Sequence, residues 1–137
     1  MIAKSDVRAD TTYARLSRTA VRQMMHRCYV LAQTGLARGE IPTAAVLYDP
    51  SCGRVIASSA NRVERDRQPL DHAECIVLRN AGVQLGHRNF HNFVLFSLLE
   101  PCQLCTEACR LYRVGGCVFG AYNRGKTYAS PPDWIGG

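Results

Sequence analysis

Length, composition and charge exclude several classes of protein. The chain has 137 residues, of which 47% are apolar and 20% charged, which suits one folded domain with a real core and excludes a disordered chain. No apolar run approaches the roughly 20 residues that cross a bilayer, so we expect no membrane partner. Residues 1–19 lack the continuous apolar stretch of a secretory signal, which predicts a cytoplasmic protein.

Arginine supplies most of the positive charge. The formal net charge is +6, with 15 arginines against two lysines. A basic surface can simply keep a protein soluble, but arginine also forms bidentate contacts with phosphate groups. Seven of the arginines gather in two segments, and this clustering favours a polyanionic partner. The two segments contain Arg15, Arg18, Arg22 and Arg27, and Arg62, Arg65 and Arg67.

The first half of the sequence predicts an arm, a helix and a hairpin. Residues 1–14 are expected to form a flexible arm. Apolar side chains then recur at helical spacing and predict an amphipathic helix of about 20 residues that ends at Gly35 or Gly39. Two strand patterns separated by turn residues follow at residues 43–48 and 54–59. A polar loop comes next.

The second half alternates helices with strands. One helix is predicted from His72 to Asn80, stopped by Gly82, and another from Cys102 to about Tyr112. Residues 92–99 are apolar and rich in strand formers, which is typical of a buried central strand. A further strand is predicted at residues 115–122.

This order of elements predicts the fold class. After Thr127, prolines and glycines favour irregular structure. A helix, a hairpin and then strands alternating with helices indicate an α/β fold, with three layers (α/β/α) and one mixed central sheet. No linker or internal repeat interrupts the pattern, so we expect residues 1–137 to form a single domain.

Two short motifs contain residues suited to metal binding. The seven cysteines are odd in number and include a CxxC pair, which favours reduced thiols and metal binding over disulfides. Pro101 precedes Cys102 at the start of a predicted helix, where free N–H groups and the helix dipole stabilise thiolates. His72 comes from the start of the other helix. Together His72, Cys102 and Cys105 suit zinc and leave a fourth tetrahedral position open.

Glu74 is the candidate catalytic residue. A catalytic zinc site keeps water in its open position, and zinc lowers the pKa of that water to around 7. Glu74 lies two residues after His72 in a helical turn, so its side chain leaves in a different direction and is poorly placed to become a ligand. It can instead lie beside the bound water and act as a general acid and base.

Other interpretations of these motifs remain open. A CxxC pair can be a redox centre, although such a pair is expected just after the first strand of a thioredoxin-like unit. A structural zinc site would need a fourth protein ligand, for which Cys75 and Cys109 are the candidates. The conjunction of His-Ala-Glu with Pro-Cys-x-x-Cys, in this order, is more specific and is the signature of zinc-dependent nucleobase deaminases.

At these residues the sequence resembles the cytidine deaminase-like superfamily. Within it, the sequence is similar to the bacterial tRNA adenosine deaminases, which convert adenosine to inosine at the wobble position of the anticodon. The resemblance runs from about Met24 to Thr127. The similar segments are "GEIPTAAVLYD", "SSANRVERDRQPLDHAE", "LFSLLEPCQLC" and "VFGAYNRGKT".

The resemblance implies a role for each site residue. His72, Cys102 and Cys105 would hold one zinc ion per chain, and Glu74 would relay protons. The Asn61 side chain would hydrogen-bond the flipped target nucleotide, and the Ala73 backbone would contact its base. The implied partner is the anticodon loop of a tRNA, and the implied assembly is a homodimer.

Several positions depart from the family pattern and keep two other functions open. The tRNA enzymes carry a further C-terminal helix that contacts the anticodon loop, and the sequence ends at Gly137 before such a helix. A second hypothesis is therefore deamination of a free nucleobase, nucleoside or nucleotide of guanine or cytosine type. A third is a zinc-stabilised nucleic-acid-binding module without turnover. The departures from the family pattern are Ala44, Leu98, Leu104, Thr106, Glu107 and Asn123.

Overall fold

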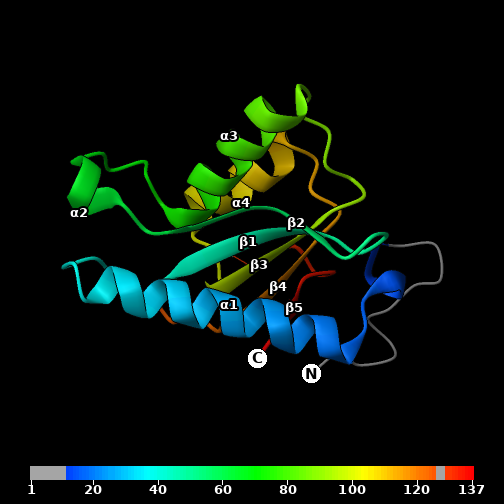
Figure 1. Cartoon of the computed structure of the whole chain (residues 1–137), viewed down its shortest axis with the longest axis horizontal. Helices are drawn as coiled ribbons and strands as arrows, with labels where there is room; N and C mark the ends of the chain where they lie inside the picture. The colour runs from blue at the N-terminus through cyan, green and yellow to red at the C-terminus, as the bar shows by residue number, and fades with distance from the viewer. Residues whose placement is uncertain (1–11, 126–128) are drawn as a thin grey trace.

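One five-stranded sheet forms the centre of the molecule, and helices cover both of its faces (Figure 1). The computed structural model describes residues 12–125 and 129–137. The elements are a 3₁₀ turn (Thr12–Arg15), α1 (Arg18–Leu36), β1 (Ala44–Asp49), β2 (Arg54–Ala60), α2 (Val63–Asp66), α3 (Ala73–Leu85), β3 (Val94–Leu99), α4 (Gln103–Leu111), β4 (Gly116–Ala121) and β5 (Ile135–Gly136).

The sheet is mixed, as the sequence predicts. Its strand order is β2-β1-β3-β4-β5. The strand β1 runs antiparallel to both β2 and β3, whereas β3, β4 and β5 are parallel to one another. Because β3 and β4 are parallel, a crossover must join them, and α4 is that crossover.

Alternating side chains of the central strands build two cores. Val46 and Phe96 pack with α1 on one face, whereas Leu47 and Leu95 pack with α3 and α4 on the other. All four side chains are fully buried. This alternation follows from the two-residue period of a strand, and it confirms the three-layer α/β/α arrangement (Figure 1).

The first helix matches its predicted span. Its N-cap is Ser17, whose side chain accepts a hydrogen bond from the Ala20 amide at 3.0 Å. The buried side chains Val21, Met24 and Cys28 recur at helical spacing and face the sheet. None of the helices described is long and apolar enough to span a membrane.

The predicted stop of α3 at Gly82 is wrong. The helix continues to Leu85 and ends at Gly86, which has the left-handed φ of +72° and donates its N–H to the Gly82 carbonyl. Gly82 lies inside the helix, at a point where a ring packs closely against the backbone. A Cβ atom built on it would lie 3.3 Å from the ring of Tyr112, so glycine allows this close approach.

Three segments expected to be irregular contain defined structure. In the predicted arm, residues 1–11 lie outside the described part of the chain, but Tyr13 is 2% exposed and packs in the core beside α1. The polar loop after β2 contains the short helix α2. Near the C-terminus, beyond the undescribed residues 126–128, Ile135 is buried in β5, which extends the sheet beside β4.

Candidate active site

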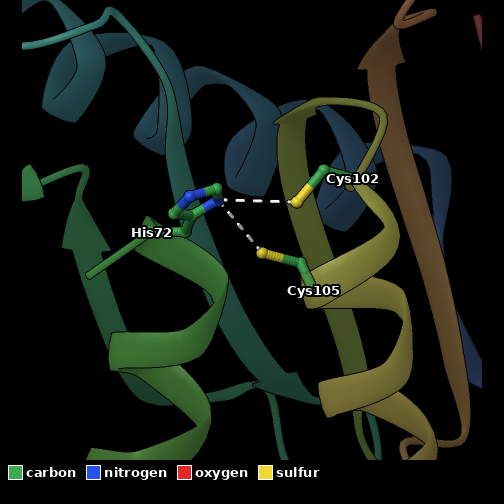
Figure 2. Close-up of side chains that lie close together, drawn as sticks. All are labelled: His72, Cys102 and Cys105. Atoms are coloured by element: carbon green, nitrogen blue, oxygen red, sulfur yellow. Dashed lines mark hydrogen bonds between the residues drawn. The ribbon is translucent and has the colours of Figure 1, made fainter. Parts of the chain in front are cut away.

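Two helices begin side by side at one end of the sheet and bring the predicted metal ligands together. His72 is the N-cap of α3 and Cys102 is the N-cap of α4. Figure 2 shows the imidazole of His72 facing both sulfur atoms. The His72 Nδ1 atom lies 3.5 Å from Cys102 Sγ and 3.6 Å from Cys105 Sγ. The ligand atoms of all three residues lie within 4.8 Å of one another.

These distances fit a single zinc ion. Zinc–sulfur bonds of about 2.3 Å and zinc–nitrogen bonds of about 2.0 Å, at a tetrahedral angle, place nitrogen and sulfur about 3.5 Å apart. The two nitrogen–sulfur distances agree with this value. One imidazole and two thiols also form a donor set that binds zinc in preference to the hard cations calcium and magnesium. The cluster can therefore hold zinc with little rearrangement.

The electrostatics of the cysteine pair also favour a metal. The pKa of Cys102 is lowered to about 5, chiefly because the Cys105 thiol donates a hydrogen bond to the Cys102 thiolate. The backbone amides of Cys105 and Leu104, at the N-terminus of α4, lower it further. The pKa of Cys105 is raised because Cys105 retains the shared proton. One thiolate is thus formed before any metal binds.

Neither candidate for a fourth protein ligand joins the cluster. Cys75 Sγ lies 3.7 Å from Cys105 Sγ, but its sulfur is outside the group of ligand atoms that lie within 4.8 Å of one another. Cys109 is buried in the core between the sheet and the helices α3 and α4. Among the described residues, His72, Cys102 and Cys105 form the one such group of histidine, cysteine and acidic side chains.

A cavity of about 230 Å³ opens beside the cluster. It is lined by His72, Glu74 and Cys102 on one side and by Asn61 and Asn123 from loops. Four of the six predicted site residues therefore line one cavity. Cys105 is buried behind it. Ala73 packs its methyl group in the core, so the backbone is the part of this residue that a ligand could reach.

Glu74 is a buried carboxyl group that lines this cavity. Its side chain is 5% exposed. Burial raises the pKa of Glu74, because the charged carboxylate loses its contact with water. Its side-chain hydrogen bond with Cys105 and the nearby His72 oppose this rise. A carboxyl group with a raised pKa beside a metal cluster suits a residue that both accepts and returns a proton.

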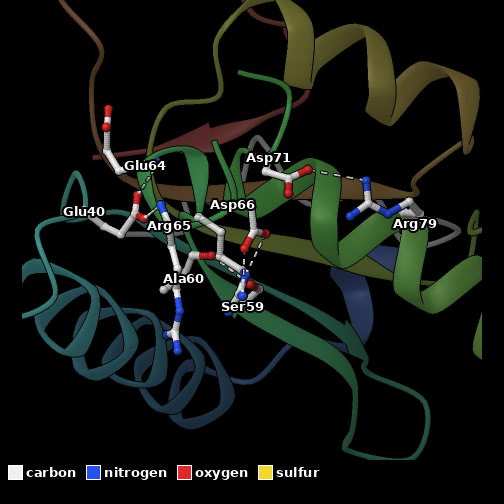
Figure 3. Close-up of polar contacts among 9 residues, drawn as sticks. Glu40, Ser59, Ala60, Glu64, Arg65, Asp66, Asp71 and Arg79 are labelled. Atoms are coloured by element: carbon white, nitrogen blue, oxygen red, sulfur yellow. Dashed lines mark hydrogen bonds and ion pairs between the residues drawn. The ribbon is translucent and has the colours of Figure 1, made fainter. Parts of the chain in front are cut away.

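Glu40 lies in the family-like segment "GEIPTAAVLYD", but its role was not predicted from the sequence. This glutamate is 5% exposed and precedes β1. Its carboxylate accepts hydrogen bonds from the backbone amides of Glu64 at 3.2 Å and Arg65 at 2.5 Å (Figure 3). It also accepts one from the Asn61 side-chain Nδ2 at 3.5 Å. It thereby caps α2, whose own N-cap residue, Arg62, makes no side-chain cap.

Glu100 makes similar contacts with a second loop. It is 7% exposed and lines the cavity directly. Its carboxylate accepts hydrogen bonds from the Asn123 amide at 3.1 Å and the Ser130 hydroxyl at 2.6 Å. Two buried glutamates therefore hold the two loops that carry the asparagines of the cavity.

Comparison with known proteins identifies the family. A family model described as the cytidine and deoxycytidylate deaminase zinc-binding region matches residues 18–121. This match includes the metal cluster, Glu74 and Asn61. The chain belongs to this family. The resemblance deduced from the motifs is confirmed, and the position of the CxxC pair after β3 agrees with this fold rather than with a thioredoxin-like unit.

Several relatives are named for tRNA. A tRNA-specific adenosine deaminase of Haemophilus influenzae is 36% identical over 99 residues, which cover 72% of this chain and 57% of the relative. The tRNA-specific adenosine deaminase of Rickettsia felis is 32% identical over 93 residues, 66% of this chain and 65% of the relative. The chain thus spans less than two thirds of the length of these curated relatives.

Solved structures share the fold. A structure from work on A-to-I editing by tRNA:A34 deaminases is 30% identical, with a TM-score of 0.76, and the match covers 85% of this chain and 92% of that chain. The guanine deaminase of Bacillus subtilis is 27% identical with a TM-score of 0.70, covering 78% of this chain and 66% of that chain. The cytidine deaminase-like fold is confirmed.

Proposed function

We propose that this protein is a zinc-dependent hydrolytic deaminase that converts adenosine to inosine at the wobble position of tRNA. The observation that carries the proposal is the cluster of His72, Cys102 and Cys105 beside the buried Glu74, in one cavity of a deaminase-family chain. The choice of substrate is supported by relatives and a solved structure that are named for this activity.

Each residue of the cluster has a proposed role. His72, Cys102 and Cys105 hold one zinc ion per chain. When bound, zinc supplies a Lewis acid that lets water act as a nucleophile at neutral pH. The Asn61 side chain and the Ala73 backbone bind the target nucleotide in the cavity.

Glu74 moves the protons of the reaction. It takes a proton from the attacking water as the new C–O bond forms at C6 of adenine, and it transfers this proton to ring nitrogen N1. It then takes the remaining hydroxyl proton and delivers it to the exocyclic amine. The C–N bond breaks, and ammonia leaves with inosine as the other product. The raised pKa of Glu74 suits this exchange, because the protonated form is stable enough to act as a donor.

The proposed partner is the anticodon loop of a tRNA. Arg62, Arg65 and Arg67 lie on the segment that carries Asn61, so phosphate groups that flank a bound nucleotide could reach them. We also propose a homodimer in the cytoplasm, on the ground of the resemblance to the tRNA enzymes.

A substrate panel tests the proposal. Zinc-loaded protein is incubated with an anticodon stem-loop containing wobble adenosine, and separately with guanine, cytidine and adenosine, while inosine, xanthine, uridine and ammonia are measured. We expect inosine from the stem-loop alone. Xanthine from guanine would favour the second hypothesis, to which the similarity to guanine deaminase points. Bound zinc without any product would favour the non-catalytic module.

A pair of variants tests the role of Glu74. Glu74→Gln keeps the size of the side chain but removes the proton acceptor, and we expect turnover to fall by about 10²- to 10⁴-fold with zinc content unchanged. Glu64→Gln, on the exposed side of α2, is the matched control and should retain wild-type turnover. Equal turnover in Glu74→Gln and wild type would contradict the proposed mechanism.

A further inference from the structure

Asn61 lies between two cavities. On one side is the cavity that contains His72 and Glu74. On the other is a smaller pocket of about 160 Å³ that includes Glu40 and Arg65 among its lining residues. Asn61 lines both. The orientation of its side-chain amide therefore decides which polar atom a ligand in the larger cavity meets.

Hydrogen bonds to the backbone fix both Asn61 and its partner, the Glu40 carboxylate. The Asn61 N–H donates to the Thr43 carbonyl at 3.1 Å, which anchors the residue to the segment before β1. The Glu40 carboxylate is held by the backbone amides of Glu64 and Arg65 at 3.2 and 2.5 Å. Figure 3 shows this carboxylate directed at the backbone of α2, with the Glu64 side chain pointing away from it.

The chemistry of a carboxylate sets the orientation of the amide. An ionised carboxylate only accepts hydrogen bonds, so the group of Asn61 that faces Glu40 must be its NH₂. The Nδ2–Oε1 distance of 3.5 Å makes this the longest of the three contacts of Glu40. The two shorter backbone contacts nevertheless keep the acceptor in front of the amide. The opposite Asn61 orientation would place the carbonyl oxygen against a carboxylate, which is repulsive.

We infer that Glu40 is a positioning residue that fixes the Asn61 amide with its NH₂ toward the smaller pocket and its carbonyl oxygen toward the metal-side cavity. Asn61 then recognises a hydrogen-bond donor of the substrate. This inference rests on the proposed function and narrows it. In an adenosine nucleotide the donors are the exocyclic amine and the ribose hydroxyl groups, because the ring nitrogens only accept.

A double-mutant cycle tests this link. Glutamine at position 40 keeps the size of the side chain but can donate as well as accept, so both orientations of the Asn61 amide find a partner. We expect Glu40→Gln and Asn61→Ala each to lower kcat/KM about tenfold or more. The double variant should be no worse than Asn61→Ala alone, within about twofold. Effects that multiply would overturn the inference, since Glu40 would then act independently of Asn61.

Two measurements separate a positioning role from a structural one. Zinc content and thermal midpoint are measured for every variant, with Glu64→Gln on α2, close to Asn61 in sequence, as the control of equal charge change. The side-chain amide resonances of Asn61 should shift in Glu40→Gln and stay in place in Glu64→Gln. Unchanged resonances in Glu40→Gln would also overturn the inference. If Glu40→Gln does not fold, Glu40→Asp takes its place, since aspartate keeps the charge but shortens the reach.

Failure of the proposed function gives a different result. If the wild-type protein produces no inosine, the proposed function fails, and the Asn61 resonances still test the Glu40 contact. If the wild type is active, a stem-loop with 2′-deoxyadenosine at the target position identifies the donor. If 2′-deoxyadenosine lowers kcat/KM in the wild type but not in Asn61→Ala, the donor that Asn61 recognises is the 2′-hydroxyl. If it changes kcat/KM equally in both proteins, the donor is the exocyclic amine.

Discussion

Tyr13 connects the segment before α1 to the strand β4. Its hydroxyl accepts a hydrogen bond from the Cys117 amide at 2.8 Å and donates one to the Cys117 carbonyl at 3.3 Å. In Tyr13→Phe the ring stays, but the buried Cys117 amide loses this partner. A buried polar group left unpaired costs about 1–3 kcal/mol. We therefore expect the free energy of unfolding to fall by about 2 kcal/mol.

Urea denaturation followed by circular dichroism measures this loss, at fixed protein and zinc concentrations. Tyr29→Phe is the matched control, because its hydroxyl accepts a bond from Gln33 on the exposed face of α1 and the residue is 49% exposed. The control should change stability by less than about 0.5 kcal/mol. An equally small change in Tyr13→Phe, with the same denaturant slope, would refute the reasoning.

Two further predictions concern the metal centre. The pKa of Cys102 is lowered to about 5 while that of Cys105 is raised, so zinc binding at pH 7 should release about one thiol proton, and release of a second should appear as the pH falls through 5. Calorimetry in buffers of different ionisation enthalpy measures the number of protons released. Release of two protons at pH 7 would contradict the prediction. Cys75→Ser should keep the zinc content of the wild type, because Cys75 is outside the ligand group. Loss of zinc, measured by atomic absorption, would show that Cys75 is a ligand.

The main elements of the fold could be predicted because their patterns are local. The period of apolar side chains located α1, and runs of strand formers located the central strands. Glycine is less specific. It ends a helix where the backbone must be left-handed, as at Gly86, but inside α3 it allows the ring of Tyr112 to approach Gly82. The sequence around Gly82 does not distinguish these two uses.

Tyr13 shows a second limit. A single aromatic residue among polar ones has no periodic pattern, so the segment resembles an arm. Its partner, Cys117, lies 104 residues away in β4. Only the assembled sheet brings the two together. Gly116, the neighbouring residue in β4, lies so close to the Tyr13 ring that a Cβ atom on it would collide with the ring.

The metal ligands of the site could be predicted from the sequence, but the role of Glu40 could not. His72, Cys102 and Cys105 are found from spacing, because ligands at the starts of two helices form short motifs. Glu40 forms no such motif with its partners. It acts on Asn61, 21 residues later, and on two backbone amides, which carry no mark of residue type. A glutamate buried by loop packing is indistinguishable in sequence from an exposed one.

The two halves of the cavity differ in how they are built. The metal cluster lies at the starts of α3 and α4, which pack on the sheet, whereas Asn61 and Asn123 lie on loops held by Glu40 and Glu100. Changes in these loops can alter the atoms presented to a ligand without moving the cluster. Structures named for tRNA:A34 deamination and for guanine deamination share this fold with the chain. In this chain we therefore expect substitutions of the loop residues, or of the glutamates that hold them, to change which ligand binds while the metal cluster stays in place.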